Sequence, residues 1–399
     1  MQSEINIGLV GHVDHGKTSL TRALSGKWTD THSEELKRGI TIHVGYADTA
    51  FYKNKKTGKY LPEHKIPAEE KEDYVLSRRV SFLDAPGHET LMATMISAAS
   101  ITDAALLIVA ANEPCPQAQT IEHMMVLDIL GIKNVIIVQN KIDLVTEEQA
   151  IKHYEQIKKF LKGTVAENAP VIPVSANYNS NIDSLIAAIE EVFVTPKRDL
   201  DSPPKMYVAR SFDINRPGQA IEKLNGGVLG GSLICGRIKK GDKLSLRPGL
   251  LKKVKDKDVF IPVDIEVVSL NSERGPIEEA IPGGLIGVGT KLDPAIVKSD
   301  LLVGQILGKD GHLGELLSEP NIEYMLIKRE GFDNSPLKMG EPLVISVGTA
   351  TSIGSVVKLK GKSLSIRLKR AIYADKGTKV ALSRRIGQRW RLSCYGTIQ

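Results

Sequence analysis

Residues 11–18 read GHVDHGKT, and this octet constrains the chain more than any other stretch of its sequence. An apolar run at 5–10 precedes it, and a helix-like stretch begins near Lys17. In this setting the spacing G-x-x-x-x-G-K-[ST] lets backbone N–H groups surround the α- and β-phosphates of a nucleotide, with the lysine on the β- and γ-phosphates. The Thr18 hydroxyl then binds Mg²⁺, and the helix dipole favours the anion. The octet therefore predicts a P-loop.

Short apolar runs alternate with amphipathic, helix-like segments over the first half of the chain. Such alternation is typical of a doubly wound, mostly parallel sheet, whose ligands gather at the carboxyl ends of the strands. We therefore predict an α/β P-loop domain over residues 1–200, with helices at 147–162 and 182–192. A stretch rich in Lys, Glu, Pro and Gly at about 51–79 indicates a surface insertion. The predicted strands are 5–10, 80–83, 104–110, 135–138 and 171–174.

Charge and proline dominate residues 195–204, which indicates a linker. After this linker, short runs rich in Val, Ile and Leu are separated by glycine turns, as at Gly226-Gly227. Short strands with turn signals at such spacing are typical of β-barrels or sandwiches. A second break at 309–320 divides the region, so we predict two β-barrel domains, at 205–310 and 320–399.

The composition is that of a soluble globular protein, with 42% hydrophobic and 25% charged residues. The three cysteines lie far apart, so neither a disulfide framework nor a zinc site is indicated. The first residues, MQSE, carry no basic segment before an apolar one, and the longest apolar run is too short to span a bilayer. A net charge of +6 permits a polyanionic partner such as nucleic acid. We expect a cytoplasmic protein with no membrane partner.

The apolar run at 80–83 leads into Asp84-Ala85-Pro86-Gly87-His88. An Asp at the carboxyl end of a strand can hold Mg²⁺, commonly through water, and a Gly just after it can bring a backbone N–H to the γ-phosphate. Asp84 and Thr18 are therefore predicted metal ligands, and Gly87 is a predicted γ-phosphate contact. A simple strand-ending turn is the alternative for this segment taken alone.

The motif NKID occupies residues 140–143, at the end of an apolar run. A carboxylate can accept both the N1–H and the exocyclic amino hydrogens of guanine, a pairing that adenine does not offer. Asp143 is therefore the predicted base reader, while Asn140 is expected to brace the loop and Lys141 to cover the purine face. Ser175-Ala176, at a further strand end, can supply a backbone N–H to the guanine O6. The sequence predicts GTP or GDP, not ATP, as the ligand.

Two further residues predict a switch and its chemistry. Thr41, in the segment RGIT at 38–41, can complete Mg²⁺ coordination only when the γ-phosphate is present. A capped helix followed by a strand start explains that segment equally well. His88 can align a water for in-line attack on the γ-phosphate, the part that a Gln plays in small GTPases. The alternative for His88 is a surface residue that caps a helix predicted at 89–99.

These motifs, followed by two β domains, resemble those of translational GTPases. Within that superfamily the chain most closely resembles the family of gamma subunits of archaeal and eukaryotic translation initiation factor 2, over essentially its whole length. The closer resemblance rests on SGKWTD (25–30), SEELKRGIT (33–41), GYA (45–47), AANEPCPQ (110–117), KLNGGV (223–228), GGS (230–232) and RWR (389–391).

The resemblance implies a GTPase that converts GTP to GDP and phosphate with Mg²⁺. It also implies a second Mg²⁺, held by Asp14 and the Gly39 carbonyl. Members of the family often carry a four-cysteine zinc knuckle in the insertion, but residues 51–79 contain no cysteine, so a zinc site is not carried over. The predicted nucleotide contacts are Asp14, His15, Gly16, Lys17, Thr18, Ser19, Gly87, Asn140, Lys141, Asp143, Ser175, Ala176 and Asn177, and the predicted metal ligands are Thr18, Thr41, Asp14, Gly39 and Asp84.

The resemblance further implies a heterotrimer with alpha and beta subunits. That heterotrimer would carry initiator Met-tRNA to the small ribosomal subunit in the GTP state and release it after hydrolysis. The tRNA would use the cleft between the P-loop domain and the second domain, with Tyr46 lining the aminoacyl pocket. Residues 358–391 hold twelve Lys or Arg and one acid, Asp375, which fits contact with an RNA backbone. A solvent-exposed face of a β domain, with no RNA partner, explains these basic residues nearly as well.

Three other functions remain open at this level. The first is an aminoacyl-tRNA elongation factor, ordinary or selenocysteine-specific, which has the same three-domain plan. The second, less favoured, is the GTPase subunit of a sulfate-activating enzyme. The third is a nucleotide-binding protein with negligible turnover, in which His88 is structural.

Overall fold

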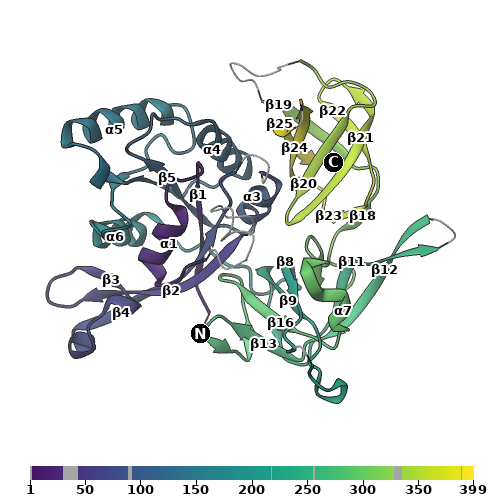
Figure 1. Ribbon diagram of the computed structural model, residues 1–399. Coiled ribbons are helices and arrows are strands. Elements are labelled where there is room, and N and C mark those ends of the chain that lie inside the picture. The colour runs from purple at the N-terminus through teal and green to yellow at the C-terminus, as the bar shows by residue number, and fades with distance from the viewer. Residues whose placement is uncertain are drawn as a thin grey trace. The chain divides into compact units, whose positions relative to one another are not determined.

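A computed structural model of the chain describes residues 2–29, 44–88, 92–216, 218–254, 257–327, 335–387 and 389–399. It forms two compact units, one comprising Ser3–Lys197 and the other comprising Arg198–Gln399 with the first two residues (Figure 1). The change from one unit to the other falls inside the predicted proline-rich linker. Each unit is described by itself.

The N-terminal unit contains a seven-stranded sheet in the order β3-β2-β4-β1-β5-β6-β7. Strands β4, β1, β5, β6 and β7 run parallel, whereas β2 pairs antiparallel with both β3 and β4. The prediction of a mostly parallel sheet is confirmed. The strands are β1 (Ile5–Gly11), β2 (Gly45–Asn54), β3 (Tyr60–Pro62), β4 (Tyr74–Asp84), β5 (Ala104–Ala110), β6 (Val135–Asn140) and β7 (Val171–Pro173).

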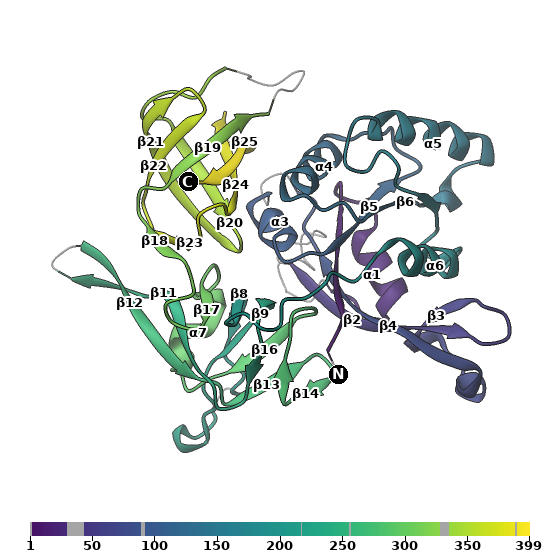
Figure 2. The same cartoon turned by 180° about the vertical axis from the view of Figure 1, so that it is seen from behind.

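Helices cover both faces of this sheet (Figures 1 and 2). One face shares a buried cluster with α1 and α6, in which Leu20, Leu24 and Ile186 pack against Ile7 and Val138. Alternate residues of β1 enter this cluster, as the period of two in a strand requires. The helices are α1 (Lys17–Ser25), α3 (Met92–Ala99), α4 (Ala118–Leu130), α5 (Glu147–Leu161) and α6 (Ile182–Val192), close to the two predicted at 147–162 and 182–192.

The stretch predicted as an insertion, 51–79, extends this sheet at one edge. It holds the end of β2, β3, the short 3₁₀ turns η1 (Glu63–Lys65) and η2 (Ala68–Asp73), and the start of β4. The Arg78 guanidinium anchors it to the end of α6, donating to the carbonyl oxygens of Ile189 at 3.0 Å and Phe193 at 2.5 Å. Arg78 also pairs with Glu190 at 2.9 Å, and their side chains are 9% and 11% exposed.

The second domain (205–310) is built on one eight-stranded sheet in the order β12-β11-β17-β8-β9-β16-β13-β14. Inward side chains from opposite parts of this sheet, such as Met206, Leu246 and Val288, meet in a single core cluster. A two-stranded sheet and the short helix α7 (Pro294–Val297) accompany it. The strands are β8 (Lys205–Phe212), β9 (Val228–Cys235), β10 (Ile238–Lys239), β11 (Lys243–Val254), β12 (Lys257–Glu266), β13 (Ser269–Ser272), β14 (Gly275–Pro276), β15 (Glu279–Ala280), β16 (Ile286–Gly289) and β17 (Ile306–Gly308).

The third domain (320–399) is a closed six-stranded barrel in the order β19-β22-β21-β20-β24-β25. Closure removes the exposed edges that an open sheet would present. A small sheet of β18 (Glu315–Leu317) and β23 (Ile372–Ala374) adjoins it. The barrel strands are β19 (Asn321–Leu326), β20 (Pro342–Val347), β21 (Ala350–Lys360), β22 (Ser363–Leu368), β24 (Lys379–Ile386) and β25 (Arg389–Ile398).

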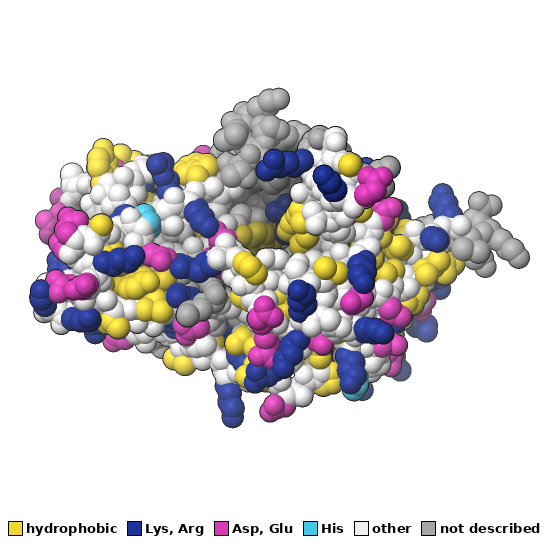
Figure 3. All heavy atoms as spheres, turned by 90° about the horizontal axis from the view of Figure 1, so that it is seen from below, with side chains coloured by type: hydrophobic (Ala, Val, Ile, Leu, Met, Phe, Trp, Pro, Cys, Tyr) yellow, Lys and Arg dark blue, Asp and Glu magenta, His cyan; other side chains and the backbone are white. Residues whose placement is uncertain are grey.

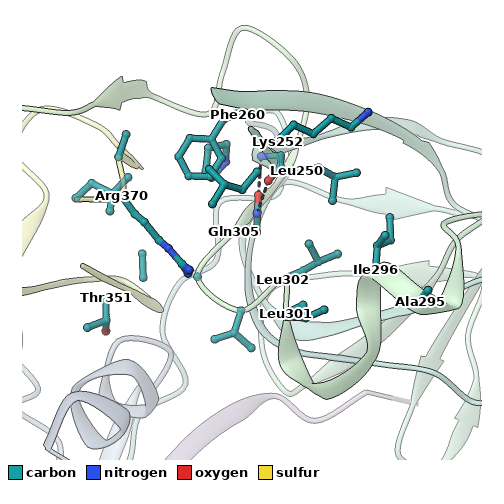
Figure 4. Close-up of a pocket in the computed structure, with 18 residues that line it drawn as sticks. Leu250, Lys252, Phe260, Ala295, Ile296, Leu301, Leu302, Gln305, Thr351 and Arg370 are labelled. Atoms are coloured by element: carbon teal, nitrogen blue, oxygen red, sulfur yellow. Dashed lines mark hydrogen bonds between the residues drawn. The ribbon is translucent and has the colours of Figure 1, made fainter. Parts of the chain in front are cut away.

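The two β domains contact each other within the second unit. Lys205 of β8 pairs with Asp375, next to β23. Both β domains line a cavity of about 480 Å³, with Leu250, Phe260 and Leu302 on one side and Arg370 on the other (Figure 4). The Gln305 amide secures the bend of β11 there, because it both accepts from the Gly249 N–H and donates to the Gly249 carbonyl at 2.8 Å.

The surface carries charges of both signs. Figure 3 shows one face on which Lys and Arg side chains are scattered among acidic and uncharged ones. None of the helices in the described ranges combines the length and the apolar character that crossing a membrane requires.

Arg78 yields a prediction about stability. Replacing it with Leu leaves the Glu190 carboxylate buried without its cation and the last carbonyls of α6 without their donor. Loss of one partner of a buried pair costs about 3 kcal/mol, so we expect the free energy of unfolding to fall by that amount and hydrogen exchange at α6 to accelerate. As a control, Lys56→Ala breaks an exposed pair with Asp73, and solvent screening should leave the free energy of unfolding almost unchanged. Equal effects of the two substitutions in urea unfolding would contradict this account.

Candidate nucleotide site

The carboxyl ends of four parallel strands bring the predicted motifs together at one edge of the N-terminal sheet. The P-loop follows β1, Asp84 ends β4, Asn140 ends β6 and Ser175 follows β7. Neighbouring parallel strands expose their ends on the same side of a sheet, which is where α/β proteins bind ligands.

Lys17 begins α1, and its side chain turns back over the loop. The ammonium donates to the carbonyl oxygens of Gly11 at 3.1 Å and His12 at 2.6 Å, and the residue is 6% exposed. These two bonds hold the charge above the backbone of the loop, at the start of a helix whose dipole also favours an anion. The arrangement is suited to phosphate oxygens.

The Asp84 carboxylate accepts hydrogen bonds from the hydroxyls of two threonines. Its Oδ2 accepts from Thr18 Oγ1 at 2.7 Å and from Thr29 Oγ1 at 2.6 Å, and the residue is fully buried. A buried carboxylate oxygen beside a hydroxyl is the hard oxygen donor set that Mg²⁺ prefers. Thr18 and Asp84 therefore fit a magnesium ion. Within the described parts of the chain, no cluster of three or more His, Cys, Asp or Glu side chains is arranged to hold a metal.

Gly87 lies against the P-loop. A Cβ at this position would stand 2.4 Å from Lys17 Nζ and 2.9 Å from both the Gly11 carbonyl oxygen and the Val13 nitrogen. Only glycine permits this approach, because every other side chain would displace the lysine or the loop backbone. The backbone of residue 87 thus reaches the place where Lys17 presents its charge. His88 follows directly and is half-buried.

Asn140 connects the phosphate side of the site to the base side. Its Nδ2 donates to the His15 carbonyl at 2.9 Å, and its Oδ1 accepts from the Ala176 N–H at 3.1 Å. The residue is 2% exposed, so these bonds are shielded from water. One amide thereby sets the distance between the P-loop and the loop after β7.

The other residues predicted on the base side surround Asn140. Lys141 takes a left-handed backbone with φ of 61°, which turns the chain into the 3₁₀ turn η4 (Ile142–Leu144). Asp143 on that turn is exposed and accessible to a ligand. Ser175 is buried, and its hydroxyl accepts from the Tyr178 N–H at 3.4 Å, whereas Asn177 between them is exposed.

The remaining predicted residues fall into two groups. Asp14, exposed with φ of 61°, and the half-buried Ser19 belong to the P-loop and the first turn of α1. Tyr46 lies on β2 opposite Leu83, next to the pairing of Gly45 with Asp84, and is half-buried. Thr41 and Gly39 lie outside the described residues.

His123, a buried histidine of α4, supports the P-loop on the side that faces this helix. This role was not predicted from the sequence. Its Nδ1 accepts from the Gly11 N–H at 2.8 Å. Burial lowers the pKa of His123 to about 3, so the ring is neutral and Nδ1 is free of a proton. In the sequence His123 is one of several polar residues of this helix, beside Glu122 and Asp128, so nothing local singles it out. Its role depends on how α4 packs against β1.

His15 is the second buried imidazole under the loop. Its Nδ1 lies 3.0 Å from the Ile108 carbonyl oxygen and its Nε2 lies 3.4 Å from a Glu113 carboxylate oxygen. Burial lowers the pKa of His15 to about 4, although Ile108 and Glu113 act in the opposite direction. The His15 ring therefore points toward β5 and not toward the nucleotide. The backbone carbonyl of His15 accepts from Asn140, on the base side of the site.

Two family models match the chain. The elongation factor Tu GTP binding domain matches residues 2–195, and the C-terminal domain of initiation factor eIF2 gamma matches residues 319–398. The first contains the P-loop, Asp84, Asn140 and Ser175, and the second corresponds to the closed barrel.

Curated relatives match from end to end. The chain is 53% identical to translation initiation factor 2 subunit gamma of Methanocaldococcus jannaschii, over all of this chain and 98% of that protein. It is 50% identical to the protein of the same name from Pyrococcus furiosus, with the same coverage.

Solved structures of elongation factors share the fold. The bacterial selenocysteine-specific elongation factor EF-Sec superimposes with a TM-score of 0.76 at 25% identity, over all of this chain and 58% of that one. Elongation factor SelB from Methanococcus maripaludis, in complex with the GTP analogue GppNHp, superimposes with a TM-score of 0.73 at 24% identity, over all of this chain and 79% of that one.

His123 yields a prediction about nucleotide binding. His123→Leu leaves the buried Gly11 N–H without an acceptor, at a cost of about 1–3 kcal/mol, so we expect GDP to bind about 5- to 150-fold more weakly in calorimetry. His123→Asn places an amide oxygen near the position of Nδ1 and should recover part of the loss. If both variants bind GDP as the parent does, the bond does not support the loop.

The same residue predicts a dependence on pH. The folded chain keeps His123 neutral down to about pH 3, whereas an unfolded imidazole takes up a proton below its ordinary pKa of 6.5. Its contribution to stability is therefore complete above pH 6.5 and declines as the pH falls from there towards 3. The stability difference between the parent and His123→Asn should shrink as the pH is lowered from 7 to 5.

Proposed function

Because the chain belongs to the family of translation initiation factor 2 gamma subunits, we propose that it carries initiator Met-tRNA to the small ribosomal subunit while GTP is bound and releases it after hydrolysis. It is a translational GTPase that binds guanine nucleotide. End-to-end identity of 53% to a named gamma subunit is the observation that carries the proposal. Alpha and beta subunits of the same factor, in a heterotrimer in the cytoplasm, complete the proposed assembly.

The proposed roles on the phosphate side follow from charge and position. Lys17 binds the β- and γ-phosphates, and the backbone N–H of Gly87 contacts the γ-phosphate. Thr18 and Asp84 would hold Mg²⁺, which would neutralise charge on the phosphates. Thr41 would complete the coordination of this ion in the GTP state. Asp14 and the Gly39 carbonyl would hold a second Mg²⁺.

The proposed roles on the base side follow from hydrogen-bonding pattern. The Asp143 carboxylate accepts from N1–H and the 2-amino group of guanine, and Lys141 covers the purine face. Asn140 positions the loop through its bonds to the His15 carbonyl and the Ala176 N–H. The Ala176 region, with Ser175 and Asn177, lies next to the expected position of O6.

Hydrolysis is proposed to depend on His88. The residue directly follows Gly87, whose backbone lies against Lys17 and the P-loop. An imidazole there can hold a water in line with the γ-phosphate, without forming a covalent intermediate.

His88→Ala tests that role. We expect single-turnover GTP hydrolysis to slow by about 10²-fold or more, the usual contribution of a positioned acid–base group, while GDP affinity stays within about twofold. His312→Ala changes an exposed histidine of the second unit and should leave the rate unchanged. An unaltered rate in His88→Ala would remove its catalytic role.

Two observations support tRNA binding: membership of the family and the basic residues at 358–391. Of the twelve Lys and Arg at 358–391, Arg384 is buried and pairs with Glu341 at 2.6 Å, so it cannot face an RNA. Ten of the others are exposed at the surface, where a phosphate can approach them. Arg367 and Lys358 share Glu319, at 3.2 and 4.0 Å, so part of this charge is already balanced.

Filter binding tests the proposed tRNA preference. With GTP and an alpha subunit present, we expect salt-sensitive capture of initiator Met-tRNA in preference to elongator tRNA. Tyr46→Ala should weaken capture about tenfold, as loss of one aromatic stacking contact does, whereas Tyr154→Ala, at an exposed tyrosine of α5, should not. Equal capture of both tRNAs would overturn initiation in favour of an elongation role.

A further inference from the structure

A cavity of about 400 Å³ opens beside the P-loop helix within the N-terminal unit. One face of α1 forms a wall, because Ser19, Arg22, Ala23 and Gly26 follow one another at helical spacing. The loop after β7 forms a second wall through Ala176 and its neighbours, and the turn η1 forms a third.

The residues that line this cavity show where it lies relative to the candidate nucleotide site. Ser19 lies at the phosphate end of the candidate nucleotide site, and Ala176 and Asn177 lie at its base end. The ribose of a nucleotide joins its phosphates to its base. A cavity bordered by both ends is therefore where the ribose edge of a nucleotide in the candidate site would face.

The lining of the cavity is cationic. Arg22 and Lys65 contribute the charge, the His64 ring lies beside them, and none of the described residues that line the cavity is acidic. The Arg22 guanidinium lies 6.0 Å from the centre of the Trp28 ring, which also lines the cavity. Burial lowers the pKa values of both His64 and Lys65, which disfavours their protonated forms. A nearby anion would act in the opposite direction.

Contacts on either side hold η1 in this position. Lys65 Nζ hydrogen bonds to the Asn179 side-chain oxygen in the loop after β7. The His64 ring packs directly on Gly26, where an added Cβ would stand only 2.9 Å from the ring. The insertion thus forms part of the wall of this cavity, and contacts to both neighbouring walls position His64 and Lys65.

We propose that this cavity is a subsite for a phosphate group carried on a ribose hydroxyl of the bound guanine nucleotide. The inference rests on the proposed function, because it needs a guanine nucleotide in the neighbouring site. Arg22 and Lys65 supply the charge, and Trp28 lines the cavity beside Arg22. The subsite would allow the factor to distinguish ribose-phosphorylated guanine nucleotides from GDP.

Competition binding with two probes tests the subsite. The probes are GDP and guanosine 5′-diphosphate 3′-monophosphate, measured on the full chain at fixed ionic strength. We expect the second probe to bind about tenfold more tightly, the effect of one charge-assisted hydrogen bond. Lys65→Ala and Arg22→Ala should each abolish most of this advantage while GDP affinity stays within about twofold.

Lys59→Ala is the matched control. Lys59 belongs to the same insertion and is exposed, but it pairs with Asp183 at 3.9 Å and does not line the cavity. This variant should retain the full preference for the 3′-phosphorylated probe.

The outcomes separate the two hypotheses. Failure of GDP itself to bind would overturn the proposed function, and retained GDP affinity shows that a variant is folded. Normal GDP binding with no preference for the 3′-phosphate, or a preference that survives in both Lys65→Ala and Arg22→Ala, would overturn the subsite.

Discussion

The carboxylate of Asp84 is the interaction on which the rest of the site depends. It is fully buried at the end of β4 and accepts hydroxyls from two other segments, the start of α1 at Thr18 and the residue Thr29 beyond its end. A buried charge is tolerated only when such donors, or a cation, compensate for lost water. The same need for compensation that stabilises the fold therefore prepares an oxygen cluster suited to Mg²⁺. The fold and the proposed magnesium site therefore depend on the same carboxylate.

Two further buried groups extend this organisation across the sheet edge. Asn140 joins the P-loop carbonyl of His15 to the Ala176 N–H, and the neutral ring of His123 receives the Gly11 N–H. Each bond is made where water is excluded, so each constrains distance more strongly than an exposed bond would. The loop is consequently held from below by α4 and from the side by β6. A phosphate cradle placed in this way needs little rearrangement to bind an anion, which lowers the cost of binding.

The sequence predicted those features whose physics is local. Buried parallel strands read as short apolar runs, and the strands at 104–110 and helix at 182–192 were predicted within a residue or two because each run has the right length and flanks. The octet at 11–18 and the motif NKID at 140–143 can likewise be located from the sequence, because each is a short local pattern. His123 could not be found this way, because its bond to Gly11 depends on the packing of α4 against β1. In the sequence Arg78 is one of many charged residues in a polar stretch. Only the structure shows that its side chain is buried and paired with Glu190.

The polar stretch at 51–79 illustrates how composition can mislead about position. It has few residues that could build a core, yet its strands add to the sheet and Arg78 fastens it to α6. Its tip reaches the nucleotide site through His64 and Lys65, whose contacts are with Gly26 and Asn179 rather than with one another. Such contacts span more than a hundred residues in the case of Lys65 and Asn179, so no local pattern can encode them. A segment without a core of its own is thereby fixed by the helix and the loop that border the nucleotide site, and its charge is brought to the cavity between them.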